Sequence, residues 1–183
     1  IMQYIGEIYS LDSEYGKKLG RQTMPRNGHL KWKAVYQPGK VVAIGYKNGK
    51  RILTETVETT RPASRIVLKA DRQTMKADGR DVSVVTVEVQ DNKGRIVPNA
   101  CPMLTFRLEG EGRIIGVGNG DPAYLGEDHP KDKDCHEFGI PAFNGLAQIL
   151  IQSSQIPSAL TLSCTADGLK QGFLSLTTAN RGE

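Results

Sequence analysis

The sequence of 183 residues has few of the residues and patterns that mark particular classes of protein. Its three cysteines, Cys101, Cys135 and Cys164, are an odd number without C-x-x-C spacing, which argues against a zinc site or a full disulfide framework. No apolar run approaches the roughly 20 residues of a membrane span, so we expect no membrane insertion. The first residues lack the regions of a signal peptide, and residue 1 is not Met. We therefore expect an excised piece of a longer polypeptide.

Patterns of catalytic residues are also missing. No G-x-S-x-G elbow for a nucleophilic serine occurs. A glycosidase needs two carboxylates about 5–10 Å apart across a cleft. Glu109 and Glu111 are the nearest pair, but they flank Gly110 at the end of an expected strand. We interpret them as acids that a turn exposes to water, and we predict no catalytic residue and no cofactor in this chain.

The one cluster of potential metal ligands is His129, Asp132, Asp134 and His136. Its spacing matches no EF-hand, zinc finger or H-E-x-x-H motif. Lys131 and Lys133 interrupt the acids and would repel a nearby cation. We therefore interpret this segment as a solvated charged loop and expect no metal.

Positive charge is concentrated in the first third of the chain. Residues 1–62 carry 11 Lys and Arg against 5 Asp and Glu, whereas residues 63–183 carry 13 against 15. A basic surface attracts nucleic acid or acidic polysaccharide. No basic run or nucleic-acid motif accompanies these residues, however. We interpret them as solvated positions and guards of edge strands, and we expect no nucleic-acid partner.

What the sequence has in abundance is alternation of apolar and polar residues with a period of two, which is typical of half-buried β-strands. The apolar positions are Val85/Val87/Val89, Leu104/Phe106/Leu108 and Leu160/Leu162/Cys164/Ala166. These side chains are expected to face a core. Thr86, Glu88 and Gln90, on the other phase of the first segment, are expected to face water.

Turn signals divide the chain into two parts. Asn48-Gly49 lies between the alternating runs 41–46 and 51–57, and Asn-Gly is the strongest short hairpin signal because both residues need positive φ. The segment 58–64 is polar and non-periodic, and we place a domain boundary there. We predict an all-β fold of two consecutive immunoglobulin-like β-sandwich domains. The first, 1–62, is small or truncated at its N-terminus, and the second, 63–183, has about seven strands.

Two further segments have local signals. Leu30, Trp32 and Ala34 alternate with Lys31 and Lys33, which predicts a strand whose Trp32 faces the core. Residues 120–144 are a long polar connection, and loops of this length inside compact domains are usually functional or mobile.

Longer strings of residues resemble a known family. Residues 19–32 (LGRQTMPRNGHLKW), 35–39 (VYQPG) and 43–50 (AIGYKNGK) are similar to a β-sandwich domain found after the catalytic barrel of bacterial family 2 glycoside hydrolases, the β-galactosidase family. The later strings resemble the C-terminal immunoglobulin-like domain of those enzymes: 68–72 (LKADR), 76–81 (KADGRD), 85–89 (VTVEV), 116–122 (GVGNGDP) and 142–145 (AFNG).

The resemblance implies a role outside the active site. The family hydrolyses terminal glycosides with retention, using two glutamates in a (β/α)₈ barrel, and no residue of this chain matches those motifs. The expected function is that of a non-catalytic accessory region that packs on or supports an upstream catalytic domain of a β-galactosidase-like enzyme. A periplasmic or secreted location also follows from the resemblance.

Two alternative functions stay open. As a carbohydrate-binding module, the chain would bind a glycan, and its candidate carbohydrate contacts are Tyr36, Tyr46, Asn119, Asp121 and Tyr124. As an adhesin-like structural immunoglobulin domain, it would share the Ala-Asp-Gly and alternating Val features of invasin-type domains. The strings before residue 62 argue against the second alternative, because adhesin arrays repeat one domain type and the two halves here show no self-similarity.

Overall fold

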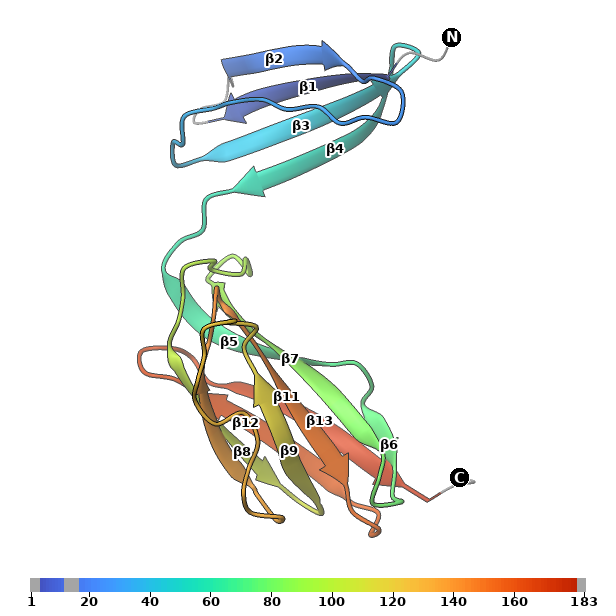
Figure 1. Ribbon diagram of the computed structural model, residues 1–183, viewed down its shortest axis with the longest axis vertical. Coiled ribbons are helices and arrows are strands. Elements are labelled where there is room, and N and C mark those ends of the chain that lie inside the picture. The colour runs from blue at the N-terminus through green and yellow to red at the C-terminus, as the bar shows by residue number, and fades with distance from the viewer. Residues whose placement is uncertain (1–3, 12–16, 181–183) are drawn as a thin grey trace. The chain divides into compact units, whose positions relative to one another are not determined.

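The computed structural model describes residues 4–11 and 17–180, and these form thirteen β-strands and no helix (Figure 1). This confirms the all-β class. The chain divides into two compact units, Ile1–Thr59 and Thr60–Glu183. Within the described ranges, no helix long and apolar enough to span a membrane is found.

The first unit is a single antiparallel sheet in the order β2-β1-β3-β4. Its strands are β1 (Tyr4–Leu11), β2 (Lys17–Thr23), β3 (Lys40–Lys47) and β4 (Lys50–Glu58). Asn48 (φ 51°) and Gly49 (φ 77°) form the turn between β3 and β4, which confirms the hairpin predicted from Asn-Gly. Over residues 4–11 and 17–59, no second sheet faces this one.

The strand predicted around Trp32 is wrong, because residues 24–39 connect β2 to β3 without joining the sheet. The segment instead lies against β2. A Cβ placed on Gly20 would be 2.7 Å from Trp32 Nε1, and Gln22 Nε2 donates to the carbonyl oxygen of Lys31 at 2.7 Å. The indole is half-buried, so apolar alternation here reflects packing on a sheet face rather than pairing within a sheet.

The second unit is an immunoglobulin-like sandwich of two sheets with nine strands, two more than predicted. One sheet has the order β5-β7-β11-β9 and the other β10-β8-β12-β13-β6. The strands of the first are β5 (Ala63–Ala70), β7 (Val82–Asp91), β11 (Leu146–Ser153) and β9 (Gly112–Gly118). Those of the second are β10 (Glu137–Pro141), β8 (Met103–Glu109), β12 (Ala159–Thr165), β13 (Gly172–Ala179) and β6 (Thr74–Lys76).

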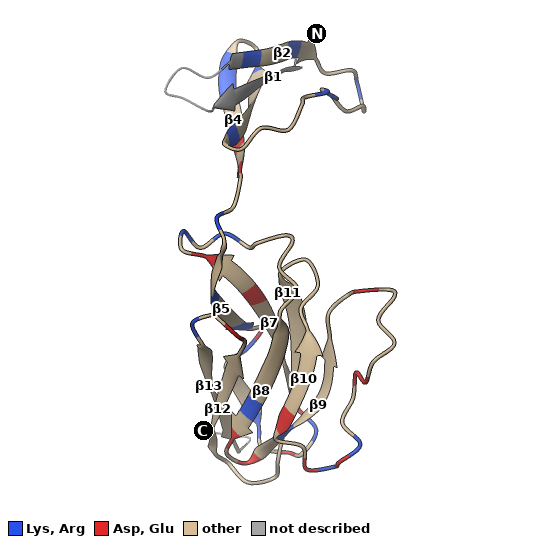
Figure 2. Cartoon of the chain, turned by 90° about the vertical axis from the view of Figure 1, so that its left-hand side faces the viewer, with Lys and Arg blue, Asp and Glu red and all other residues tan. Residues whose placement is uncertain are grey.

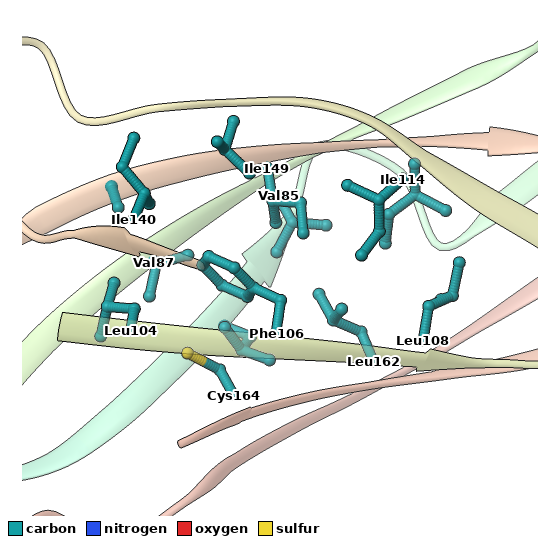
Figure 3. Packing of buried hydrophobic residues seen from close by; sticks show 14 of the residues in the cluster. Val85, Val87, Leu104, Phe106, Leu108, Ile114, Ile140, Ile149, Leu162 and Cys164 are labelled. Atoms are coloured by element: carbon teal, nitrogen blue, oxygen red, sulfur yellow. The ribbon is translucent and has the colours of Figure 1, made fainter. Parts of the chain in front are cut away.

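Both sheets contribute to one buried cluster, and the predicted core positions are confirmed (Figure 3). Val85, Val87 and Val89 of β7 are fully buried, as are Leu104 and Phe106 of β8 and Leu160, Leu162 and Cys164 of β12. Burial raises the pKa of the Cys164 thiol to about 12. All three cysteines are free, and Cys101 is exposed.

Glu88 and Gln90 were expected in water, but both are buried. Side chains of the neighbouring strand cover them. Lys69 Nζ donates to Glu88 Oε1 at 2.7 Å, and Arg65 donates to Gln90 Oε1 through Nε and Nη2 at 3.2 and 3.0 Å. Gln90 Nε2 in turn donates to Glu88 Oε2 at 2.6 Å. The alternation of apolar and polar residues along β7 does not predict this burial, because it is caused by long basic side chains of β5 that lie across β7.

Asp91 ties the start of the second unit to the end of β7. Its side chain is fully buried and accepts hydrogen bonds from the backbone amides of Arg61, Lys93 and Arg95 at 2.9, 2.9 and 3.0 Å. Arg95 Nε donates to it as well, at 2.8 Å. Burial alone would raise the pKa of Asp91, but the bonds from Arg95 and the backbone amides outweigh burial and hold it well below its usual range.

We expect Asp91→Asn to flatten the acid dependence of stability. A carboxylate with a depressed pKa stabilises the folded state above its unfolded pKa of about 3.9, and this contribution is lost as pH falls through the folded pKa. Thermal unfolding between neutral pH and roughly pH 2 should therefore show a smaller decline for the variant than for the parent chain. At neutral pH the variant should melt lower by about 5 °C or more.

Asp167→Asn is the matched control, because Asp167 is exposed in the turn between β12 and β13. It should follow the parent curve. Parallel acid profiles for the parent and Asp91→Asn would show that Asp91 contributes nothing to the pH dependence.

Candidate functional site

The two candidate tyrosines of the first unit lie near opposite ends of β3. The Tyr36 ring is 75% exposed, and its hydroxyl lies 3.4 Å from Thr59 Oγ1, which also accepts the amide of Gly39. Tyr46 is half-buried near the hairpin end of the strand. Six residues of strand separate Lys40 from Tyr46, or about 20 Å. The rings therefore do not form one stacking platform, and contact of either ring with sugar stays a prediction.

The other three candidates lie together in the loop after β9, where their polar groups bond to the backbone of the loop and of β10. Asn119 Nδ2 donates to the carbonyl oxygen of Pro141 at 3.0 Å, and its Oδ1 accepts the amide of Asp121 at 3.0 Å. Asp121 Oδ1 accepts the amide of Ala123 at 2.9 Å. Tyr124 is half-buried against the core cluster. These contacts give all three a role in loop structure, and carbohydrate contact by them stays a prediction.

The same loop, residues 119–136, runs beside β9 at the edge of its sheet (Figure 2). The amides of Val117 and Ile114 donate to the carbonyl oxygens of Asp128 and Cys135, each at 2.8 Å. An edge strand with unpaired amides invites pairing with another chain. The loop removes that hazard by taking up these two amides.

Charged pairs on the loop are local and exposed. A hydrogen bond from Lys131 lowers the pKa of Glu127, and one from His129 lowers the pKa of Asp128. Across the residues that the structure describes, no three Asp, Glu, His or Cys side chains converge on a point where a metal could sit.

The expectation of one continuous connection over 120–144 is wrong at its end. Strand β10 forms there and pairs with β8, matching Phe138 with Phe106 and Ile140 with Leu104. Ile140 is fully buried. The alternation of Phe138 and Ile140 was the available signal, but Gly139 and Pro141 make so short a segment look like a turn.

Sequence reasoning missed a pocket of about 460 Å³ at the end of the second sandwich. Three chain reversals that are distant in the sequence line it: Gly79 before β7, the Gly110–Glu111 turn between β8 and β9, and residues 153–155 after β11. Arg113, Asp134 and His136 complete its wall. Nothing in the spacing of these residues indicates that they meet, because only the sandwich topology brings their turns together.

Glu109 and Glu111 lie on either side of Gly110, whose φ of 103° makes the turn, and both are exposed as predicted. Glu109 is 3.9 Å from Arg107 Nε, whereas Glu111 is one of the residues that line the pocket.

Comparison with known proteins finds a family match in each unit. The family described as glycoside hydrolase family 2 C-terminal domain 5 matches residues 66–175, and a domain of unknown function (DUF4982) matches residues 10–53. A β-galactosidase of Bacteroides ovatus is 34% identical over 150 residues, which are 82% of this chain and 17% of that protein. A β-galactosidase of Thermoanaerobacter pseudethanolicus is 36% identical over 76 residues, 42% of this chain and 10% of the other.

Solved structures agree. A glycosyl hydrolase family 2 member from Bacteroides cellulosilyticus superimposes with a TM-score of 0.86 at 25% identity, covering 96% of this chain and 22% of its own. A β-glycosidase from Bacteroides vulgatus shares the fold with a TM-score of 0.80 at 23% identity, covering 97% and 22%. The chain thus spans about a fifth or less of the length of these relatives. Because the family match extends over more than half of its residues, the chain belongs to the glycoside hydrolase family 2 C-terminal domain 5 family.

Proposed function

We propose that this chain is a non-catalytic accessory region of a β-galactosidase-like family 2 glycoside hydrolase, and that it supports a catalytic barrel carried elsewhere on the same polypeptide. The names of the relatives support the enzyme class, and the small share of their length that the chain matches supports an accessory part. A periplasmic or secreted location stays a prediction of the resemblance.

The observation that carries the proposal is an uncovered apolar surface on the first unit. No side chain described over residues 18–59 is fully buried. Leu53 and Val57 of β4 are 56% and 74% exposed, and they share one face of the sheet because they are four residues apart on a strand. Their register partners on β3 are Gly45 and Val41, and Glu55, paired with Ala43, lies between them on the same face, so the surface is apolar with one acid within it.

Covering this surface would stabilise an assembly. Burying a Leu or Val side chain contributes about 1.5–3 kcal/mol. The occupant that we propose is the catalytic part of the same polypeptide, because related proteins carry the matched region within a chain more than four times as long. A covalently tethered partner is always present at high effective concentration, so a modest apolar patch is enough to hold it.

The non-catalytic claim is tested by assaying residues 1–183 with an aryl β-galactoside. We expect no turnover above the buffer rate. Turnover that copurifies with the chain would contradict the accessory role. If that turnover also persists in Glu109→Gln and in Glu111→Gln, the catalytic residues are others within 1–183. Loss of such turnover in either variant would instead identify the acid pair as catalytic.

The packing claim is tested in the longer polypeptide that carries this region. We expect Leu53→Lys with Val57→Lys to lower its thermal midpoint by several degrees, because two buried contacts are replaced by charges. In residues 1–183 alone the same change should have little effect, since both side chains are already in water. Ile156→Lys, at a side chain 58% exposed on the second unit, is the control and should be neutral in both. Equal thermal midpoints for the double variant and the parent, both measured in the longer polypeptide, would show that this face of β4 is not part of the interface.

A further inference from the structure

The pocket at the end of the second sandwich has walls of mixed polar character. Three backbone turns form much of it, and two glycines leave their own backbone as lining. A Cβ on Gly110 would be 2.4 Å from the carbonyl oxygen of Ala159, and one on Gly112 would be 3.1 Å from that of Gln152. The other residues that line this space are Gly79, Glu111, Arg113, Asp134, His136, Ser153, Ser154 and Gln155.

Several of these polar groups have no partner within the second unit as described. Glu111 and Asp134 use only backbone groups in their hydrogen bonds, so within residues 60–180 their carboxylates have no hydrogen-bond or ion-pair partner, nor does the Gln155 amide. Ser153 is 97% buried on the inward phase of β11, and its Oγ has no hydrogen-bond partner. Because this Oγ has almost no accessible surface, it lies behind the pocket wall, and the groups open to a ligand are the two carboxylates and the Gln155 amide.

Other groups of the wall are fixed in place. Arg113 Nε and Nη2 donate to Gln152 Oε1 at 2.9 and 2.6 Å, and Nη1 donates to the carbonyl oxygen of Lys133 at 2.8 Å. His136 Nδ1 lies 3.2 Å from the carbonyl oxygen of Leu108, which can only accept, so Nδ1–H donates to it and the ring is held in place. The pocket thus combines a rigid cation, a ring nitrogen, two carboxylates and an amide.

These groups select the ligand class. A cation would need converging oxygen or nitrogen ligands, and no group of three is formed among the described residues. An anion would meet two carboxylates against one guanidinium. The mixture of acceptors and donors instead fits a neutral molecule with many hydroxyl groups, each of which can donate and accept. The volume of about 460 Å³ is that of a small-ligand site.

We propose that this pocket binds a neutral saccharide unit, with the carboxylates of Glu111 and Asp134 accepting hydrogen bonds from its hydroxyls. The site is separate from the five contacts predicted from the sequence. The choice of galactose as the probe rests on the proposed function, whereas the preference for a neutral sugar rests on the pocket alone. Without an aromatic ring in the wall, the affinity should be millimolar.

The experiment is a titration of the ¹⁵N-labelled chain 1–183 with D-galactose, followed by NMR. We expect saturable shifts of the amides of Gly79, Gly110, Gly112 and Ser153. Glu111→Gln and Asp134→Asn should each weaken binding about tenfold, as expected when a hydrogen bond to a charged group is lost. Ser153→Ala should leave binding unchanged, since its Oγ is buried behind the wall and out of reach of a ligand in the pocket.

Glu109→Gln is the matched control: it makes the same chemical change two residues away, outside the pocket, and should bind as the parent does. D-Glucuronate, which carries a negative charge, should bind at least tenfold more weakly than D-galactose, and glycerol should cause no saturable shift at these amides. If D-glucose binds as tightly as D-galactose, the pocket still binds a neutral saccharide, but it has no preference for the sugar on which a galactosidase acts. Absence of saturable shifts with both neutral sugars, or shifts unchanged by both carboxylate variants, would overturn the proposal, and neither result bears on the packing of β4.

Discussion

Replacing Phe106 with alanine should lower the free energy of unfolding of the second unit by about 3–5 kcal/mol, the loss expected when a buried Phe leaves a cavity. The ring is fully buried at the middle of β8 and lies among Val87, Leu104 and Val85 from the two sheets (Figure 3). On its own sheet it is held between Phe138 of β10 and Cys164 of β12. Contacts from both layers and both neighbouring strands are lost together, so little collapse can refill the space.

Urea unfolding followed by far-UV circular dichroism measures this loss. Trp32, the single tryptophan of the chain, lies in the first unit, so its fluorescence follows that unit separately and should not change. Phe173→Ala makes the same chemical change on β13, where the ring is 66% exposed, and should stay within about 0.5 kcal/mol of the parent. Similar losses for the two variants would show that Phe106 is not the centre of the core.

Much of this core could be predicted from the sequence because a strand alternates its side chains between two faces whatever its neighbours are. Val87 and Phe106 follow that rule, and both are fully buried. Glu88 departs from it, because its burial depends on Lys69 of another strand. The alternation within β7 cannot show which residue of β5 lies beside it. Trp32 departs from it for the opposite reason: its segment packs on a sheet face without joining a ladder.

The site was harder to predict for a similar reason. Aromatic residues and a long loop draw attention in a sequence, yet Tyr36 and Tyr46 lie near opposite ends of one strand. Glu111 and Asp134 meet at one pocket only because hairpin turns far apart in the chain lie at the same end of a sandwich. Strand order and register decide that meeting, and neither can be read from local spacing.

Gly145 shows how strongly one turn residue can constrain the fold. The residue has a φ of 77°, which follows the left-handed Asn144 in the turn before β11. Its amide donates to the carbonyl oxygen of Ala100 at 2.8 Å, and its own carbonyl oxygen accepts the amide of Val89 at 2.8 Å. A Cβ at this position would lie 2.4 Å from the carbonyl oxygen of Val97. Because two hydrogen bonds fix the backbone, the turn cannot move away.

Gly145→Ala should therefore destabilise the second unit by about 2–5 kcal/mol, the sum of a left-handed alanine and a clash with backbone. Gly168→Ala separates the two causes, since Gly168 has a φ of 72° but no atom within 4 Å of the added Cβ. That variant should lose only about 1–2 kcal/mol, the conformational part of the effect. Both are measured by the same urea unfolding of residues 1–183. Equal losses of unfolding free energy in the two variants would mean that the Val97 carbonyl moves aside at no cost. The segment before β8 would then be held less firmly against the β11 turn than its hydrogen bonds indicate.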